Sequence, residues 1–122
     1  MNEKVVNHLK FKVQVICADK IALGPGKADL LDAIDAHGSI SAAARVLGLS
    51  YRRAWLMVDV MNHCWTQPLV DATKGGRKGA KLSDNGHNIL LYYRDLEAKF
   101  EKLSSDQSAR FLMAGLQDQD SS

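Results

Sequence analysis

The stretch from residue 38 to residue 55, GSISAAARVLGLSYRRAW, constrains the fold most, because it predicts two short helices joined by a glycine turn. The hydroxyl of Ser39 or Ser41 can accept a hydrogen bond from the free N–H groups that open the first helix, and Ser50 can do the same for the second. Gly48 can end the first helix, since glycine adopts the left-handed conformation at little cost. The layout is typical of a DNA-binding helix-turn-helix, with an ordinary helical hairpin as the alternative.

A basic β-hairpin is expected directly after this helix pair. Apolar residues predict strands at 69–73 and 81–83, and between them lies a tip rich in glycine and positive charge, KGGRKGAK. Glycine lets backbone N–H groups approach phosphates without a side-chain clash. Two helices followed by a basic hairpin predict a winged helix-turn-helix, a mainly α fold with small β elements.

The N-terminal third predicts a second β-hairpin and one further helix. Apolar and polar residues alternate at the start of 9–17, which predicts a half-buried strand there, and residues 21–23 predict a short return strand. Residues 27–37 predict a helix that is apolar on one side and acidic on the other. Its expected core-facing residues are Leu30, Leu31 and Ile34, and its expected water-facing residues are Asp29, Asp32 and Asp35.

Within the helix-turn-helix, helical spacing predicts which side chains face the core. These are Ala43, Val46 and Leu47 in the helix at 41–47, and Ala54, Val58 and Met61 in the helix at 51–64. Trp55 then lies near the opposite face, beside two arginines. An exposed tryptophan there can stack on nucleic acid or pack against a neighbouring helix, and the sequence leaves both interpretations open.

The last long helix is expected at 84–104, where apolar residues recur at alternating steps of four and three: Ile89, Tyr93, Leu96, Phe100 and Leu103. Such a heptad seam favours pairing with the same helix of a second subunit, with packing on the chain's own core as the alternative. We therefore expect residues 1–104 to form a winged helix-turn-helix DNA-binding domain. Residues 105–122 are expected to be an acidic, loosely ordered tail.

Positive charge is concentrated on the predicted helix pair and wing. The segment from Arg45 to Lys81 holds seven basic and two acidic residues, a net charge of +5, whereas the remainder of the chain carries −3. This asymmetry indicates a surface that meets phosphates, although a solvated basic loop would have the same composition.

Other kinds of site have little support in the sequence. The four histidines are scattered and no nucleophile motif or carboxylate pair accompanies them, so neither catalysis nor a cofactor is expected. Cys17 and Cys64 lack metal-ligand spacing and are expected to be reduced thiols of a cytoplasmic protein. His63 beside Cys64 lacks further ligands nearby, so no metal site is expected. No run approaches the roughly 20 apolar residues of a membrane span.

From Gly38 to Lys99 the sequence resembles the DNA-binding domain of the ModE family of molybdate-responsive transcriptional regulators. The likeness lies in residues 38–41 (GSIS), 50–55 (SYRRAW), 61–62 (MN), 69–70 (LV), 75–80 (GGRKGA) and 82–86 (LSDNG). A similar Leu-Ser-x-x-Gly pattern after the wing occurs in LysR-type regulators. The preceding hairpin and the LGPG run at 23–26 resemble short, stand-alone members of the ModE-like group.

The resemblance implies a homodimer whose recognition helix and wing read an operator. Full-length ModE proteins also carry a C-terminal molybdate-binding domain of the oligonucleotide/oligosaccharide-binding type. Because this sequence ends about twenty residues after the predicted long helix, we expect no such domain here. The resemblance therefore supports DNA binding more firmly than molybdate sensing.

The leading hypothesis is a dimeric winged-helix protein that binds double-stranded DNA and regulates transcription, with molybdate as a candidate effector. Arg52 or Arg53 would contact guanine in the major groove, and the wing would hold phosphates. The full set of expected DNA-binding residues is Ser41, Arg45, Ser50, Tyr51, Arg52, Arg53, Trp55, Lys74, Arg77, Lys78 and Lys81. The alternative is a winged-helix module that binds a protein through Trp55 and Leu56, without specific DNA binding.

Overall fold

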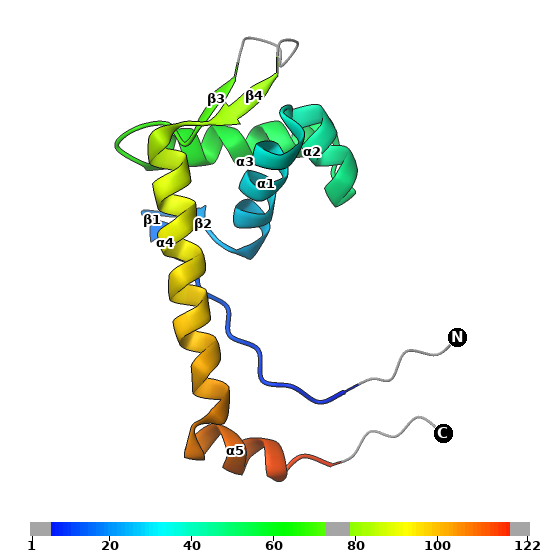
Figure 1. Ribbon diagram of the computed structural model, residues 1–122, viewed down its shortest axis with the longest axis vertical. Helices are drawn as coiled ribbons and strands as arrows, with labels where there is room; N and C mark the ends of the chain where they lie inside the picture. The colour runs from blue at the N-terminus through cyan, green and yellow to red at the C-terminus, as the bar shows by residue number, and fades with distance from the viewer. Residues whose placement is uncertain (1–5, 73–78, 118–122) are drawn as a thin grey trace, which may run out of the picture.

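The computed structural model describes residues 6–72 and 79–117 and shows a mainly α fold with two small antiparallel hairpins (Figure 1). The elements are β1 (Val15–Cys17), β2 (Lys20–Leu23), α1 (Pro25–His37), α2 (Ile40–Leu47), α3 (Tyr51–Cys64), β3 (Val70–Ala72), β4 (Ala80–Leu82), α4 (Asp84–Glu101), the short 3-10 helix η2 (Lys102–Ser105) and α5 (Gln107–Ala114). This order and pairing confirm the predicted winged helix-turn-helix.

Local capping defines the helix-turn-helix, as the sequence predicted. The Ser39 hydroxyl accepts a hydrogen bond from the Ala42 N–H at 3.1 Å, so Ser39 rather than Ser41 caps α2. Gly48 ends α2 in the left-handed region, at φ 71°. Ser50 caps α3 by accepting a hydrogen bond from the Arg53 N–H at 3.1 Å. These caps fix the first residue of each helix.

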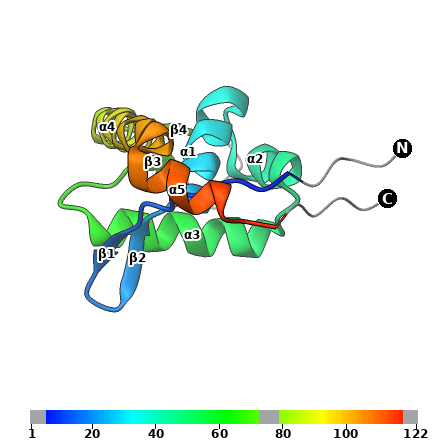
Figure 2. The ribbon, with the colours of Figure 1, turned by 90° about the horizontal axis from the view of Figure 1, so that it is seen from below.

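The core lies where α1, α2 and α3 meet, and Figure 2 shows α1 between α3 and α4. Its fully buried side chains confirm the predicted stripes of α1 and α3: Leu30, Leu31, Ile34, Ala54, Val58 and Met61. The prediction for Val46 is wrong, because 59% of this side chain is exposed. The buried face of α2 is set by Ile40, Ala43 and Ala44, and Val46 lies off that face.

The N-terminal segment keeps the predicted alternation but forms less strand than expected. Leu9, Phe11, Val13 and Val15 are half-buried and the residues between them are exposed, yet β1 comprises only Val15–Cys17. Residues 9–14 have no partner strand among the described residues. The Val13 carbonyl instead accepts a hydrogen bond from the Tyr93 hydroxyl of α4 at 2.7 Å.

The base of the wing is tied to the helix-turn-helix at two places. The Asn62 side chain accepts hydrogen bonds from the N–H groups of Leu69 and Val70, at 2.9 and 3.1 Å, and donates to the Val70 carbonyl at 3.0 Å. On the other strand, the Ala80 N–H donates to the Gly38 carbonyl at 2.8 Å. β3 begins one residue later than the predicted 69, and β4 is shifted by one residue from 81–83, while residue 73 lies outside the described residues. The wing is therefore held from α3 and from the turn before α2.

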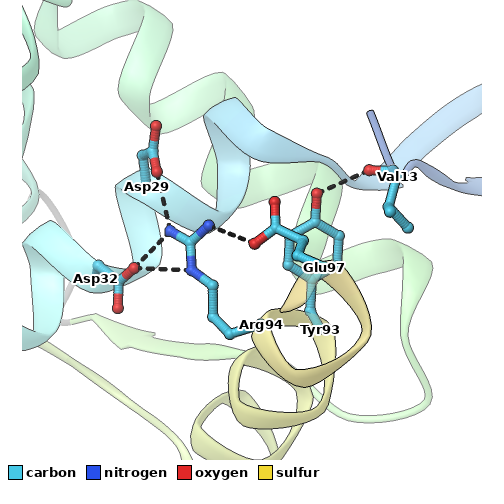
Figure 3. Close-up of polar contacts among 6 residues, drawn as sticks. All are labelled: Val13, Asp29, Asp32, Tyr93, Arg94 and Glu97. Carbon is cyan, nitrogen blue, oxygen red and sulfur yellow. Dashed lines mark hydrogen bonds and ion pairs between the residues drawn. The ribbon is translucent and has the colours of Figure 1, made fainter. Parts of the chain in front are cut away.

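Helix α4 leaves the domain as a long projecting rod and is fixed to α1 by one arginine (Figure 1, Figure 3). The Arg94 guanidinium donates to Asp29 at 2.9 Å, to Asp32 at 2.6 and 3.2 Å, and to Glu97 at 2.8 Å. Although burial opposes the charged form, these hydrogen bonds raise the pKa of Arg94 above its ordinary value. Asp29 and Asp32 are exposed, as predicted, and the structure adds that both bind Arg94.

The start of α4 approaches the wing at the closest backbone contact of the described glycines. A Cβ placed on Gly86 would overlap the Leu69 carbonyl oxygen and stand 2.9 Å from its carbon. The same oxygen accepts a hydrogen bond from the Ser83 N–H at 2.9 Å. Only glycine lets α4 begin this close to the chain entering β3.

The segment after α4 differs from its prediction. The long helix ends at Glu101 instead of residue 104, and η2 turns the chain into α5. The expectation of a loosely ordered tail from residue 105 is corrected over Gln107–Ala114, where Asp106 caps the helix by accepting from the Ser108 N–H at 2.9 Å. The Asn7 side chain donates to the Gln117 carbonyl at 3.2 Å, which ties the two ends of the described chain together.

Candidate nucleic-acid interface

The first turn of α3 carries four of the predicted DNA-binding residues. Ser50 is engaged as the N-cap, while the side chains of Tyr51, Arg52 and Arg53 are exposed. No acidic residue occurs in this turn. Because the cap fixes where the helix begins, the two guanidinium groups start from a rigid backbone. A rigid helix N-terminus with exposed arginines can enter a major groove and reach base edges.

Trp55 lies at the boundary between the core and this surface. Its ring is half-buried and packs against the core, and it meets Tyr51 edge-on, with ring centroids 6.4 Å apart and planes at 80°. The indole N–H donates to the Tyr51 hydroxyl. Of the two interpretations left open, packing therefore accounts for most of the indole surface. The pair also stiffens the first turn of α3.

Helix α2 presents two further predicted residues, Ser41 and Arg45, both exposed. The Ser41 hydroxyl lies 3.5 Å from that of the capping residue Ser39. In a helix-turn-helix the first helix of the pair crosses the phosphate backbone, and a serine at its start and an arginine near its end suit that role.

The structure describes the base of the wing but only one of its predicted basic residues. Lys81 is exposed on β4 and pairs across the strands with Asp71 in the Cα register. Lys74, Arg77 and Lys78 lie outside the described residues. Gly79 adopts a φ of 93° directly beside the Gly38 carbonyl, which is a conformation and a distance that exclude other residues.

The charges on this surface have few intramolecular partners. Within residues 6–72 and 79–117, Arg45, Arg52, Arg53 and Lys81 form no ion pair. Asp59, one of the two acids in the basic segment, faces the His63 ring at 3.3 Å instead. Unpaired cations on an exposed surface are available to phosphates, and the affinity that they supply depends on salt.

The predicted seam of α4 divides between the core and the surface. Tyr93 is 4% exposed and Ile89 packs against the core, so these two side chains belong to the chain's own fold. Leu96, Phe100 and Leu103 are exposed, and Phe100 lies 6.4 Å from the Phe11 ring. The alternative interpretation therefore accounts for the first half of the seam, and only its second half is free for a partner.

Sequence reasoning missed most of the apolar surface at this end of the molecule. Exposed apolar side chains also include Leu91 and Tyr92 on α4, and Phe111, Leu112 and Leu116 on or just after α5. The apolar run Phe111-Leu112-Met113 is evident in the sequence. Because no helix was predicted there, the sequence did not indicate which of these side chains would be exposed. Exposed apolar side chains that share one face of a helix can mark an interaction surface.

The described residues offer little for other chemistry. No three histidine, cysteine, aspartate or glutamate side chains gather within them as metal ligands. Cys17 and Cys64 are free and half-buried, and the Cys17 thiol donates to the Cys64 carbonyl at 3.8 Å. Burial, and then a hydrogen bond with Cys17, raise the pKa of the Cys64 thiol. Every helix in the described ranges is too short or too polar to cross a bilayer.

Comparison with known proteins finds relatives over most of the chain, while no family model matches it. The molybdenum transport protein ModE of Azotobacter vinelandii is 41% identical over 91 residues, which make up 73% of this chain and 34% of that protein. The molybdenum-pterin-binding protein MopB of Rhodobacter capsulatus is 44% identical over 85 residues, 68% of this chain and 32% of that protein. The DNA-binding transcriptional dual regulator ModE of Escherichia coli strain K12 is 34% identical over 89 residues, which make up 71% of this chain and 34% of that protein. The chain spans about a third of the length of the curated relatives it matches.

Proposed function

This chain is a ModE-like protein that shares part of the length of its relatives, and from that premise we propose that it binds double-stranded DNA as a transcriptional regulator linked to molybdenum. Relatives of the chain include proteins named as transcriptional regulators, and others are named for molybdenum transport or molybdenum-pterin binding. These names describe regulatory, transport and binding proteins rather than enzymes.

The observation that carries the proposal is the capped first turn of α3, with exposed arginines that have no partner among the described residues. In this proposal α3 enters the major groove and Arg52 reads a base edge. A bidentate contact to guanine discriminates by about 1–3 kcal/mol. Tyr51, Ser50 and the exposed edge of Trp55 flank that contact.

The remaining predicted residues hold phosphates in this proposal. Ser41 and Arg45 would contact the backbone from α2, and Lys81 would contact it from the base of the wing. The wing-tip residues Lys74, Arg77 and Lys78 belong to the proposal through their charge and their place in the sequence alone. Backbone contacts of this kind position the protein without reading sequence.

We further propose that the protein acts as a homodimer through the distal half of α4 together with α5. Leu96, Phe100 and Leu103 are exposed there, and Phe111 and Leu112 are exposed on α5. Tyr93 and Ile89 are excluded from this interface because they pack inside the chain's own fold. A two-fold dimer would present two copies of α3 to two half-sites on DNA.

The test is binding of the full chain to fluorescent duplexes from its own upstream region, in a salt series, with and without molybdate. Tight binding that weakens steeply with salt is expected, because the contacts displace counterions from phosphates. Arg52→Ala should lose about tenfold in affinity for the preferred duplex and little for an unrelated one. Lys102→Ala, which removes one charge from η2, is the matched control.

Equal binding to all duplexes, with no salt dependence, would refute the proposal and favour the protein-interaction module. A change in affinity on adding molybdate would identify that anion as the effector. An affinity that is the same with and without it would leave the regulator with another signal.

A further inference from the structure

A basic groove separate from the wing opens beside the recognition helix. It has a volume of about 390 Å³ and lies between the N-terminal segment, the start of α1 and the side of α3. Four cationic side chains line it: Lys10, Lys12, Lys27 and Arg53. No acidic residue occurs among the described residues of its lining. Three segments distant in the sequence therefore bring like charges to one concave surface.

These four cations are not neutralised within the fold. Over the ranges that the structure describes, none of them takes part in an ion pair or a side-chain hydrogen bond. Partial burial lowers the pKa of Lys27, and the positive charge of Arg53 lowers it further, although Cys64 has the opposite effect. Cations that crowd together without a counter-charge are stabilised by an anion between them.

The backbone at the groove adds hydrogen-bond donors. Gly24, the N-cap of α1, makes no side-chain capping bond, and the first turn of α1 holds no acidic residue. The first helical hydrogen bond runs from Ala28 N–H to the Gly24 carbonyl, so the N–H groups of Gly26 and Lys27 precede it. Helices α2, α3 and α4, in contrast, are all capped by a serine side chain.

We propose that this groove binds a tetrahedral oxyanion of the phosphate type, held by Lys27 and Arg53 and by the N–H groups that open α1. Arg53 supplies a planar pair of donors and Lys27 a point charge, the combination that phosphate-type oxygens accept. Lys10 and Lys12 extend the positive field along the groove. The two neighbouring arginines then have different roles. Arg53 holds an oxyanion at the edge of α3, and Arg52 faces outward, where it can contact a base.

The same chemistry has two sources, a DNA backbone phosphate and a free oxyanion in solution. The DNA source rests on the proposed function, since α3 must lie on DNA for a phosphate to reach Arg53. The free source is independent of it. Each source is measured in its own arm of the experiment, with the full chain.

The test compares Lys12→Gln/Lys27→Gln with Lys20→Gln/Lys102→Gln. The control removes the same charge at two exposed lysines that do not line the groove. In the first arm, sodium phosphate, sulfate and molybdate are titrated at constant ionic strength, and the backbone amide signals of Gly26 and Lys27 are followed by NMR. Saturable shifts are expected in the wild type and the control, with binding roughly tenfold weaker in the groove variant.

In the second arm, duplex binding is measured over a salt series. The groove variant should weaken binding to every duplex about equally and reduce the salt slope by about one to two, while the control should not. An effect in the first arm identifies a free oxyanion as a ligand, and an effect confined to the second arm identifies DNA phosphate.

If the groove variant equals the control in both arms, the groove proposal is refuted. If the wild type still binds DNA when the groove variant equals the control, the proposed function stands although the groove proposal fails. When wild type binds no DNA but its amides shift with free anions, the proposed function fails and the groove remains.

Discussion

Substitution of Gly86 by alanine is the sharpest test of how α4 is joined to the wing. The added methyl would overlap the Leu69 carbonyl oxygen and stand 2.9 Å from the carbon and 3.2 Å from the Cα of the same residue. All three atoms are backbone, so no side-chain rotation relieves the contact. The chain entering β3 must move, or α4 must start elsewhere.

The free-energy cost of that movement depends on the contacts that Leu69 makes. Its carbonyl accepts the Ser83 N–H at 2.9 Å, a hydrogen bond that contributes about 0.5–1.5 kcal/mol. Its side chain is fully buried, and overpacking in a core costs about 1–3 kcal/mol. Alanine recovers up to about 1 kcal/mol, because it favours a helix over glycine. We expect the free energy of unfolding to fall by about 2 kcal/mol.

The assay is urea unfolding followed by far-UV circular dichroism, at one fixed protein concentration because of the proposed dimer. The unfolding midpoint should fall by about 1 M. Gly26→Ala is the matched control: Gly26 also lies in the first turn of a helix, but the nearest atom to its Cβ is Met57 Cε at 3.9 Å. That variant should gain about 0.4–1 kcal/mol. If Gly86→Ala is as stable as Gly26→Ala, the close approach is not a constraint and the reasoning is wrong.

Three further predictions concern the joints of the fold. Arg94→Gln should lower the free energy of unfolding by about 1–2 kcal/mol, a value between those of exposed and buried ion pairs. Added salt should recover part of this loss, because it screens the repulsion between the remaining carboxylates. A stability equal to that of wild type and independent of salt would contradict this prediction. Burial and the neighbouring Glu97 raise the pKa of Tyr93 to about 12 from an ordinary 10, so the stabilisation of wild type over Tyr93→Phe should be full below pH 10 and fall by about 2–3 kcal/mol as pH rises through 12. A difference between these two proteins that does not change with pH would count against a buried Tyr93 hydroxyl. Asn62→Ala should leave two backbone amides at the wing base without an acceptor, cost about 1–3 kcal/mol and speed their hydrogen exchange; unchanged exchange would show that another group holds the wing.

Features that depend on a few neighbouring residues were predictable from the sequence. The caps at Ser39 and Ser50 and the left-handed Gly48 each act within one helical turn, so the helix-turn-helix and its bounds followed from local chemistry. The alternation of residues 9–15 likewise predicted which side chains are half-buried, although it overstated the strand. A strand needs a partner as well as a pattern, and residues 9–14 lie without one in the described part of the chain.

Features that depend on distant residues were not predictable. The Arg94 cluster joins residues 62 and 65 positions apart, and the hydrogen bond between Tyr93 and Val13 spans 80 positions. A heptad pattern indicates that one side of α4 is apolar but not what covers that side. It therefore could not predict that Tyr93 is buried while Leu96 is exposed. The basic groove at Arg53 was hidden for the same reason, since its four cations come from three separate segments.

Among the contacts that hold α4, two fix its backbone direction, with the Tyr93–Val13 hydrogen bond between them. Gly86 against Leu69 is one of the two and Arg94 against α1 is the other, and eight helical residues separate them by about 12 Å. Glu101 lies about 22 Å from Gly86, so the last two turns of α4 extend about 10 Å beyond Arg94. With Gly86 as the pivot, a shift of about 1 Å at Arg94 is magnified nearly twofold at the free end. Small repacking at the carboxylates of α1 would therefore swing α5 and the apolar surface that it carries, while the winged domain itself stays unchanged.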